Sequence, residues 1–210
     1  MLIKTIPSGP FDTNAYVIGC PSTKMAIIVD PAPDSFENIK KYLESEGLTP
    51  VAVILTHSHW DHIGDAEKVK NYFNIPVMIH ERDSGNLEKP GSDGLPCWMA
   101  IPGVKADRFL KEGDEIVVGE ISFKVIETPG HTPGGICLYS EKEKCLIAGD
   151  TLFKQSIGNL SFPTARPNEM WLSLDKLAQL PKDTAVYPGH GPSTTIGEES
   201  WLPNARQIFE

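Results

Sequence analysis

The sequence of 210 residues has no apolar run long enough to span a membrane and no cluster of basic residues. Its longest apolar segments, such as residues 26–29 and 51–55, fall far short of the roughly 20 residues that a transmembrane helix needs. The formal net charge of −9 is spread along the chain without a basic stripe, which disfavours nucleic acid and anionic membrane surfaces as partners. A small-molecule substrate fits this composition better, and the length predicts a single domain over residues 1–210.

Cysteines are also few, and their spacing excludes two common roles. Cys20, Cys97, Cys137 and Cys145 are unevenly spaced and form no Cys-x-x-Cys pair, so they indicate neither a disulfide framework nor a thiolate zinc site. The first seven residues begin no long apolar segment of the kind found in secretory signals. We therefore expect a cytoplasmic protein, and the sequence leaves both a monomer and a small homo-oligomer open.

Four potential metal ligands stand within six residues in the segment His57-Ser58-His59-Trp60-Asp61-His62. The apolar run 51–55 before it has the length of a strand and β-branched residues at alternate positions. Apolar residues at helical spacing over 63–73 predict an amphipathic helix that starts near Asp61. In a turn between a strand and a helix, His57 and His59 can face one metal ion, and Asp61 and His62 a second. Imidazole and carboxylate without thiolate suit zinc, iron or manganese.

The remaining pattern alternates strands with helices, which is typical of a layered α/β architecture. Asp34 and Glu37 have the spacing of a capping box for the first helix, and Gly47 stands where its C-terminal cap belongs. Residues 81–110 show no periodicity and predict a long loop, a candidate lid with Trp98 at its apolar tip. Strands are predicted at 2–6, 15–20, 25–30, 51–55, 75–80, 115–118, 121–127, 136–139, 145–148 and 184–187, and helices at 36–47, 61–73 and 167–180.

Three further potential ligands follow predicted strands, where a rigid sheet can aim side chains at one point. His131 lies in the turn 128–135, which is rich in glycine and proline, Asp150 ends an apolar segment, and His190 follows the last predicted strand. Each of them alone would be an ordinary surface or packing residue, but their common placement after strands indicates a metal centre. His80, the one remaining histidine, is expected to be structural.

With these residues the chain resembles the metallo-β-lactamase superfamily, whose pattern is His-x-His-x-Asp-His followed by a lone His, a lone Asp and a lone His. The resemblance covers nearly the whole chain and implies a four-layer αββα sandwich, in the α/β (α+β) class, with two divalent metal ions at one edge of the sheets. Zinc is the first expectation for both ions, and iron or manganese are the alternatives. The resemblance also implies specific roles: His57, His59 and His131 on the first ion, Asp61, His62 and His190 on the second, Asp150 as the bridge, Asp61 and Asp150 as the catalytic residues, and Asp30 as a carboxylate that supports the ligands from behind.

Within this superfamily the sequence is most similar to glyoxalase II-like (hydroxyacylglutathione hydrolase-like) enzymes of the single-domain kind. Trp60 and the segments Gly149-Asp150-Thr151-Leu152-Phe153 and Tyr187-Pro188-Gly189-His190-Gly191-Pro192 carry this resemblance. It implies that a hydroxide bridging two metal ions attacks a thioester such as S-lactoylglutathione.

Two departures from glyoxalase II concern the substrate. The chain stops at Glu210, whereas full-length glyoxalase II enzymes have a C-terminal helical domain with basic groups for glutathione. Relatives often show Gly-Arg-Thr-Asp where this chain has Gly158-Asn159-Leu160-Ser161, so the guanidinium that would hold a carboxylate is missing. Lys154 and Asn159, which follow Asp150, are the candidate substrate-binding residues.

Other reactions on the same scaffold stay open, because a fold does not determine the chemistry. A persulfide dioxygenase would use one iron ion held by His57, His131 and Asp150, but the absence of Arg-Thr-Asp after Gly158 counts against it. A lactonase of this superfamily typically has a tyrosine where this chain has Phe153, and a secreted β-lactamase would carry an export signal. Hydrolysis of another ester or lactone and a non-catalytic metal-binding role are the further alternatives.

Overall fold

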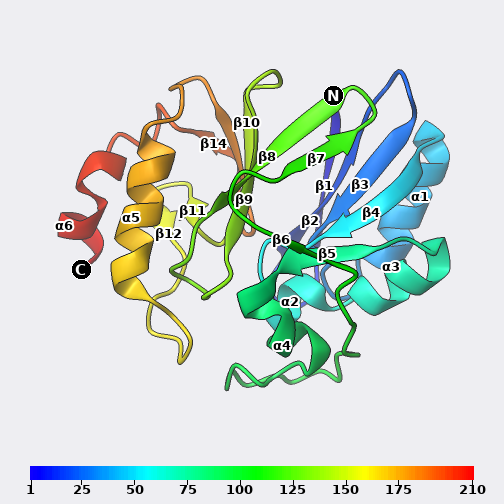
Figure 1. Cartoon of the computed structure of the whole chain (residues 1–210), viewed down its shortest axis with the longest axis horizontal. Coiled ribbons are helices and arrows are strands. Elements are labelled where there is room, and N and C mark those ends of the chain that lie inside the picture. The colour runs from blue at the N-terminus through cyan, green and yellow to red at the C-terminus, as the bar shows by residue number, and fades with distance from the viewer.

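Two β-sheets pack face to face, and helices cover both outer sides (Figure 1). The computed structural model describes all 210 residues. The first sheet has the strand order β1-β2-β3-β4-β5-β6 and uses residues up to 110, while the second has the order β14-β13-β10-β9-β8-β7 and uses residues from 115 onward. This arrangement confirms the four-layer αββα sandwich that was predicted from the sequence.

In the first sheet, β1, β2 and β3 are antiparallel neighbours, whereas β3, β4, β5 and β6 run parallel. Helices α1 (Phe36–Glu46) and α3 (Ala66–Phe73) cover its outer face, and their buried side chains, such as Ile39 and Val69, share one apolar cluster with Ile28 and Val53 of the strands. The six strands are β1 (Leu2–Ser8), β2 (Thr13–Gly19), β3 (Met25–Val29), β4 (Thr49–Ile54), β5 (Val77–His80) and β6 (Arg108–Leu110).

In the second sheet, β10 and β13 are parallel and all other neighbours are antiparallel. Helix α5 (Pro167–Ala178) packs Leu174 and Leu177 against Leu146 and Val186 of the strands, next to η2 (Leu202–Asn204) and α6 (Ala205–Phe209). The strands are β7 (Glu115–Val118), β8 (Ile121–Glu127), β9 (Ile136–Ser140), β10 (Cys145–Gly149), β13 (Ala185–Pro188) and β14 (Thr194–Thr195), and β11 (Leu152–Phe153) with β12 (Ser156–Ile157) forms a separate small hairpin.

The core between the two sheets follows from the side-chain alternation of the strands. In β8, Phe123 and Val125 are buried and face the first sheet, where Ile18 and Ile27 meet them, while Lys124 is exposed. All five residues of β10 are buried, because this strand has the first sheet on one side and α5 on the other.

The helix predicted from Asp61 to residue 73 is in fact two helices, α2 (Trp60–Ile63) and α3. The break falls at Asp65, whose backbone N–H donates to the Pro31 carbonyl (2.9 Å) and whose carboxylate accepts the backbone N–H of Phe36 (2.8 Å). Asp65 therefore caps α1, and the predicted capping box of Asp34 and Glu37 was wrong. The C-terminal cap is confirmed, since Gly47 has a φ of 63° and its N–H bonds to the end of α1.

The long loop predicted over 81–110 is only partly a loop. It begins with η1 (Glu81–Asp83) and α4 (Ser84–Glu88) and ends with β6, so that only 89–107 has no helix or strand. These elements are three to five residues long, which is too short to produce a visible periodicity. Strands β11, β12 and β14, with two residues each, were not predicted for the same reason. The lid role of this segment stays a prediction.

All helices are short, and α5 is the longest with 12 residues. None of them has the length and apolar character that crossing a lipid bilayer requires. The four cysteines are free, and three of them are buried among other side chains.

Helix α5 offers a matched test of the packing. Leu174 is fully buried against the second sheet, whereas Leu172 on the same helix is 64% exposed. We expect Leu174→Ala to lower the free energy of unfolding by about 2–5 kcal/mol, and Leu172→Ala to change it by less than about 0.5 kcal/mol. Urea denaturation of both variants measures the difference. Equal effects of the two substitutions would contradict the placement of α5.

Candidate metal centre

The predicted ligands stand directly after strand ends, at one edge of both sheets. Asp30 follows β3 and His57 follows β4, which are parallel neighbours in the first sheet. Asp150 follows β10 and His190 follows β13, which are parallel neighbours in the second. Because parallel strands have their carboxyl ends at the same edge, each sheet presents its loops together. The structure thus brings all seven residues predicted as ligands into one site.

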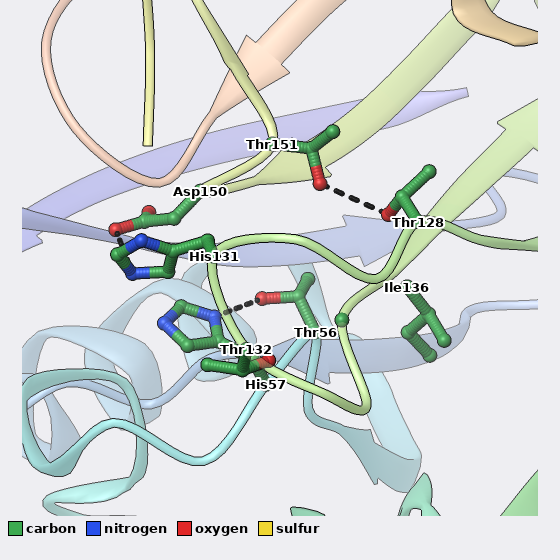
Figure 2. A pocket seen from close by; sticks show the side chains of 9 residues that line it. Thr56, His57, Thr128, His131, Thr132, Ile136, Asp150 and Thr151 are labelled. Carbon is green, nitrogen blue, oxygen red and sulfur yellow. Dashed lines mark hydrogen bonds and ion pairs between the residues drawn. The ribbon is translucent and has the colours of Figure 1, made fainter. Parts of the chain in front are cut away.

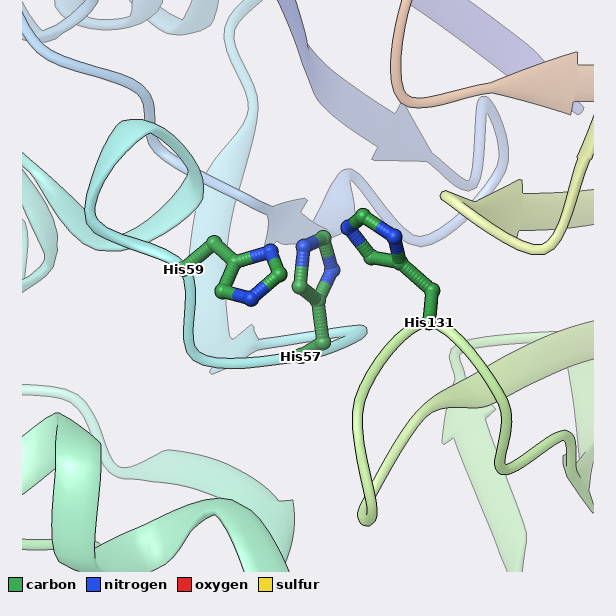
Figure 3. A group of neighbouring side chains, drawn as sticks. All are labelled: His57, His59 and His131. Atoms are coloured by element: carbon green, nitrogen blue, oxygen red, sulfur yellow. The ribbon is translucent and has the colours of Figure 1, made fainter. Parts of the chain in front are cut away.

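The first cluster contains His57, His59 and His131, all buried, with one ring nitrogen from each within 4.8 Å of the others (Figure 3). The ring centroids of His57 and His59 are 4.8 Å apart, and His131 lies 4.5 Å from His59 and 5.1 Å from His57. His57 and His59 come from the loop after β4, and His131 comes from the loop after β8. The three rings have the composition of a three-histidine metal site.

The second cluster contains Asp61, His62 and His190, whose ligand atoms also lie within 4.8 Å of one another. The Nε2 atoms of His62 and His190 are 3.3 Å apart, and Asp61 Oδ2 is 3.3 Å from His190 Nε2. Asp30 is close enough to His57 and His62 to form a third group. Both of its oxygens are already bonded, however, to Thr56 and to His62 Nδ1, so Asp30 supports the ligands rather than joining them.

Asp150 lies between the two clusters. Its Oδ2 atom is 3.3 Å from Nε2 of His131 in the first cluster (Figure 2) and 3.5 Å from Nε2 of His190 in the second. Its Oδ1 atom is 3.3 Å from Nε2 of His62. A carboxylate in this position can contact ions in both clusters at once.

Four of the five histidines in the centre use Nδ1 for a hydrogen bond to the protein, which leaves Nε2 free to face the centre. This is the arrangement that metal-ligating histidines adopt, because the second bond fixes both the tautomer and the ring orientation. The partners are Thr56 Oγ1 for His57 (3.1 Å), Asp30 Oδ2 for His62 (3.0 Å), the Asn159 carbonyl for His131 (2.9 Å) and the Phe11 carbonyl for His190 (3.1 Å).

The polar atoms of the centre fit divalent metal ions. The Nε2 atoms of His57, His59 and His131 are buried and have no hydrogen-bond partner within the protein. Leaving several buried polar atoms unpaired is costly, and a cation among them removes that cost. Nitrogen and carboxylate donors without sulfur suit zinc, iron and manganese, so the donor set agrees with the expected cofactors but does not choose among them.

Metal binding requires neutral imidazoles and ionised carboxylates, and the ionisation of His57, His59, Asp61 and Asp150 meets this requirement. Burial and the neighbouring rings lower the pKa of His57, and they lower that of His59 to about 3. Burial would raise the pKa of Asp150, but the charge of His62 outweighs it and lowers this pKa to about 2; the pKa of Asp61 is lowered in the same way. The pKa of His62 is raised instead, because Asp150 and Asp61 outweigh the effect of burial.

Sequence reasoning missed several residues that hold these ligands in place. Thr13 donates its hydroxyl to Asp61 Oδ2 (2.7 Å), and Thr56 donates its N–H and hydroxyl to the two oxygens of Asp30 (2.7 and 2.6 Å). The buried carboxylate of Asp83 accepts the N–H groups of Ser58 and Gly134 (3.0 and 2.6 Å). It thereby joins the loop that carries His57 and His59 to the loop that carries His131. Nothing in the local sequence marks Thr13 or Asp83, because each bonds to segments that are remote in the chain.

Strand β2 fixes the loop that carries His190. The side-chain amide of Asn14 donates to the carbonyls of Pro188 and Gly191 (3.0 and 2.9 Å), and the Tyr16 hydroxyl donates to the same Pro188 carbonyl (2.6 Å). Gly189 lies so close to Asp150 and His62 that a side chain there would collide with both. This loop therefore depends on contacts with the first strands of the chain.

The two candidate substrate residues lie at the margin of the centre. Asn159 bonds to His131 through its backbone, while its side chain accepts hydrogen bonds from Ser161. Lys154 is exposed. Substrate contact by either side chain stays a prediction. His80 pairs with Glu127 (3.2 Å) and accepts the Arg82 N–H, and it belongs to neither metal cluster, as expected of a structural histidine.

A model of the metallo-beta-lactamase superfamily matches residues 8–190, and this chain belongs to that family. Together with the ligand clusters, this membership indicates a metal-dependent hydrolase. An uncharacterized protein of Aquifex aeolicus is 40% identical over 202 residues, which are 95% of this chain and 94% of the relative. The probable metallo-hydrolase YqgX of Bacillus subtilis is 32% identical and covers 92% of each chain. A hydroxyacylglutathione hydrolase of Brucella ovis is 37% identical over 85% of this chain, which spans 62% of that relative.

Solved structures agree with the fold. BLEG-1, described as a B3 metallo-beta-lactamase, superposes with a TM-score of 0.88 at 38% sequence identity and covers all of both chains. TTHA1623 in a di-iron-bound form superposes with a TM-score of 0.81 at 33% identity and covers 94% of this chain and 96% of its own. The chain thus resembles proteins described with different reactions, so the substrate has to be argued from the site.

Replacement of Asp150 tests its place between the clusters. We expect Asp150→Ala to lose metal binding and activity, because the substitution removes the one carboxylate that contacts both clusters and leaves His62 without its largest opposing charge. Elemental analysis of the purified variant measures the loss. Asp175→Ala, a change of an exposed carboxylate on α5, serves as the control. A variant at position 150 that kept two ions and full activity would refute the assignment.

Metal affinity should depend on pH in a direction set by His62 and His190. The pKa of each is raised above the ordinary value of 6.5 by the neighbouring carboxylates, so each ring holds a proton that a metal ion must displace. We expect zinc affinity to keep rising with pH above 6.5, by up to roughly tenfold per pH unit for each ring that titrates. Competition with a chromophoric chelator between about pH 6.5 and 8.5 measures this, and a flat profile would contradict it.

Proposed function

We propose that this protein is a binuclear metal-dependent hydrolase that cleaves a small-molecule thioester. The observation that carries the proposal is the position of Asp150 within 3.5 Å of histidine nitrogens from both ligand clusters. His57, His59 and His131 would hold one ion, and Asp61, His62 and His190 the other. Zinc is the first candidate for both positions, with iron and manganese as alternatives.

When bound, two such ions lower the pKa of a shared water molecule to about 7 and polarise the substrate carbonyl. The protein supplies the geometry for this reaction. Thr13 fixes one oxygen of Asp61 by its hydroxyl, so that this carboxylate is held ready to orient the attacking water. Asp30 holds the His62 ring from behind, and six of the seven ligands, all except His190, are buried away from bulk water.

A thioester is favoured over other substrates by similarity to hydroxyacylglutathione hydrolases. The segments around Asp150 and His190 resemble those enzymes, and a hydrolase of that description from Brucella ovis is 37% identical. A thiolate is a good leaving group that needs no separate general acid, and the chain offers no obvious acid beside the two clusters. Lys154 and Asn159 are the proposed contacts for the polar part of the substrate.

Hydrolysis of a β-lactam is the second candidate. It is favoured by one observation, the TM-score of 0.88 and 38% identity with BLEG-1, described as a B3 metallo-beta-lactamase. A strained amide needs the same carbonyl polarisation but has a nitrogen leaving group, which is harder to expel without a proton donor.

The function is tested on protein purified without air, first by metal analysis and then by three assays: hydrolysis of S-lactoylglutathione, oxygen uptake with glutathione persulfide, and hydrolysis of a cephalosporin. We expect about two metal equivalents with thioester cleavage, and loss of cleavage after treatment with a chelator. Asp175→Ala should behave like the wild type in all assays, because Asp175 is exposed on α5 and belongs to neither ligand cluster.

Each alternative has its own signature in the same experiment. One equivalent of iron with oxygen uptake that depends on the persulfide would replace the proposal by a dioxygenase. Two metal equivalents with cephalosporin cleavage alone would favour the second candidate. Two equivalents with none of the three activities would exclude a glutathione thioester as the substrate. If uncharged thioesters without glutathione are not cleaved either, the thioester proposal is overturned, and the search turns to other esters, lactones and phosphodiesters.

A further inference from the structure

Three aromatic rings from distant segments meet beside the metal centre. Phe11 lies in the turn between β1 and β2, Trp60 begins α2, and Trp98 lies in the segment 89–107. Their centroids are 5.3 Å apart for Phe11 and Trp60, 5.6 Å for Phe11 and Trp98, and 5.8 Å for Trp60 and Trp98, so each ring touches the other two. Trp60 is buried, whereas Trp98 is 71% exposed. Such exposure of a large apolar side chain beside a candidate catalytic centre needs an explanation.

These rings form the wall of a cavity of about 490 Å³, here called the aromatic pocket. This volume is typical of small-molecule sites. Its floor contains His59, Asp61 and His190, residues from both ligand clusters. A molecule in the pocket would therefore reach the centre directly. The apolar lining is formed by Phe11, Trp60, Leu95, Pro96, Trp98 and Phe162.

The charge of the aromatic pocket disfavours an anionic substrate group. Neither lysine nor arginine lines it, and Asp61 is its only carboxylate. Glutathione carries two carboxylates, which would find no lysine or arginine on these walls. An uncharged apolar group would instead gain by leaving water for the aromatic surface.

The segment that carries Trp98 is held in place by a polar network. The side chain of Asn86 in α4 accepts the backbone N–H groups of Gly91 and Asp93 (3.0 and 3.2 Å), and Asp93 in turn accepts the N–H of Leu95 (3.0 Å). Asn86 also donates to the carbonyl of Ser58, between the two ligands His57 and His59. Asn86 thus links the segment that leads to Leu95 of the pocket wall with the loop that carries His57 and His59.

We propose that the aromatic pocket binds an uncharged aryl or branched alkyl group of the substrate, and that this protein acts on thioesters with such a group rather than on glutathione conjugates. This inference rests on the hydrolase function proposed above. The apolar group can belong to the acyl part or to the thiol part of the thioester, because the pocket borders residues of both clusters.

Three model thioesters separate these cases. S-methyl thioacetate has no large group, S-benzyl thioacetate has an aryl group on the thiol side, and S-methyl phenylthioacetate has one on the acyl side. We expect kcat/KM for at least one aryl thioester to exceed that of S-methyl thioacetate by roughly 10- to 100-fold. The ratio of kcat/KM for this aryl thioester to kcat/KM for S-methyl thioacetate should fall at least fivefold in Trp98→Ala and recover in part in Trp98→Phe. The aryl thioester that shows this sensitivity identifies the side of the substrate that enters the pocket.

Tyr72→Ala is the matched control. Tyr72 in α3 is also a largely exposed aromatic residue, 55% exposed, and it contacts the rings of Phe36 and Phe73, but it lies on the outer face of the first sheet. This variant should keep the wild-type ratio of aryl to methyl thioester.

A binding measurement does not depend on turnover. The ketones 4-phenyl-2-butanone and 1-phenyl-2-butanone are the analogues of S-benzyl thioacetate and S-methyl phenylthioacetate with carbon in place of sulfur, and neither can be hydrolysed. We expect ligand-detected NMR, with and without a chelator, to show at least one of them binding at least tenfold more tightly than 2-butanone, and Trp98→Ala and Phe11→Ala to weaken that binding at least fivefold. If neither ketone binds more tightly than 2-butanone, or if neither variant weakens the binding, the proposal is overturned.

The failure of the hydrolase function is distinguishable from the failure of the pocket. If an aryl ketone binds in a way that depends on Trp98 but no thioester is hydrolysed, the hydrolase function is refuted, while the aromatic pocket is supported as a site for apolar groups. Rapid hydrolysis of S-lactoylglutathione with no preference for aryl thioesters and no effect of Trp98→Ala would support thioester hydrolysis. The same result would refute the proposal that the aromatic pocket binds an apolar group of the substrate.

Discussion

The contact of one buried carboxylate with three histidine rings is the constraint on which the site depends. Asp150 comes from the second sheet and lies within 3.5 Å of His131, His62 and His190, and His62 comes from the loops of the first sheet. Such a cluster is stable only if its charges are balanced, because unpaired charge in a buried place is costly. The two sheets must therefore meet with their loop-bearing edges aligned, and the αββα packing provides this alignment.

A layered α/β fold and the identity of the clustered residues follow from local sequence signals, whereas the four-layer αββα sandwich was implied by the family resemblance. Apolar runs such as 51–55 indicate the strands, and the six-residue segment from His57 to His62 marks the centre by its density of potential ligands. The grouping of the ligands came from a family resemblance, and the structure places those residues in matching groups. Metal binding itself and the substrate contacts of Lys154 and Asn159 are still to be tested.

What the sequence did not reveal depends on contacts between distant segments. Asp65 caps α1 from the break between α2 and α3, which no rule about neighbouring residues predicts. Asp83 joins two ligand loops, and Thr13 bonds to a residue 48 positions away. The aromatic pocket was equally hidden, because the sequence marked Trp60 and Trp98 separately and gave no sign that the fold brings their rings together with that of Phe11. Short strands such as β11 and β14 were missed because two residues carry no period.

The bonds from β2 to the loop after β13 bear on the order of events during synthesis. Asn14 and Tyr16 leave the ribosome early, while their partners at Pro188 and Gly191 emerge some 170 residues later. Domains emerge from their N-terminal side, and contacts between such remote segments form slowly because the long intervening chain must first be ordered. The nascent chain contains His57, His59 and His62 well before His190 has been synthesised. The second cluster can therefore be completed only after the segment that carries His190 has been synthesised and has bonded to β2.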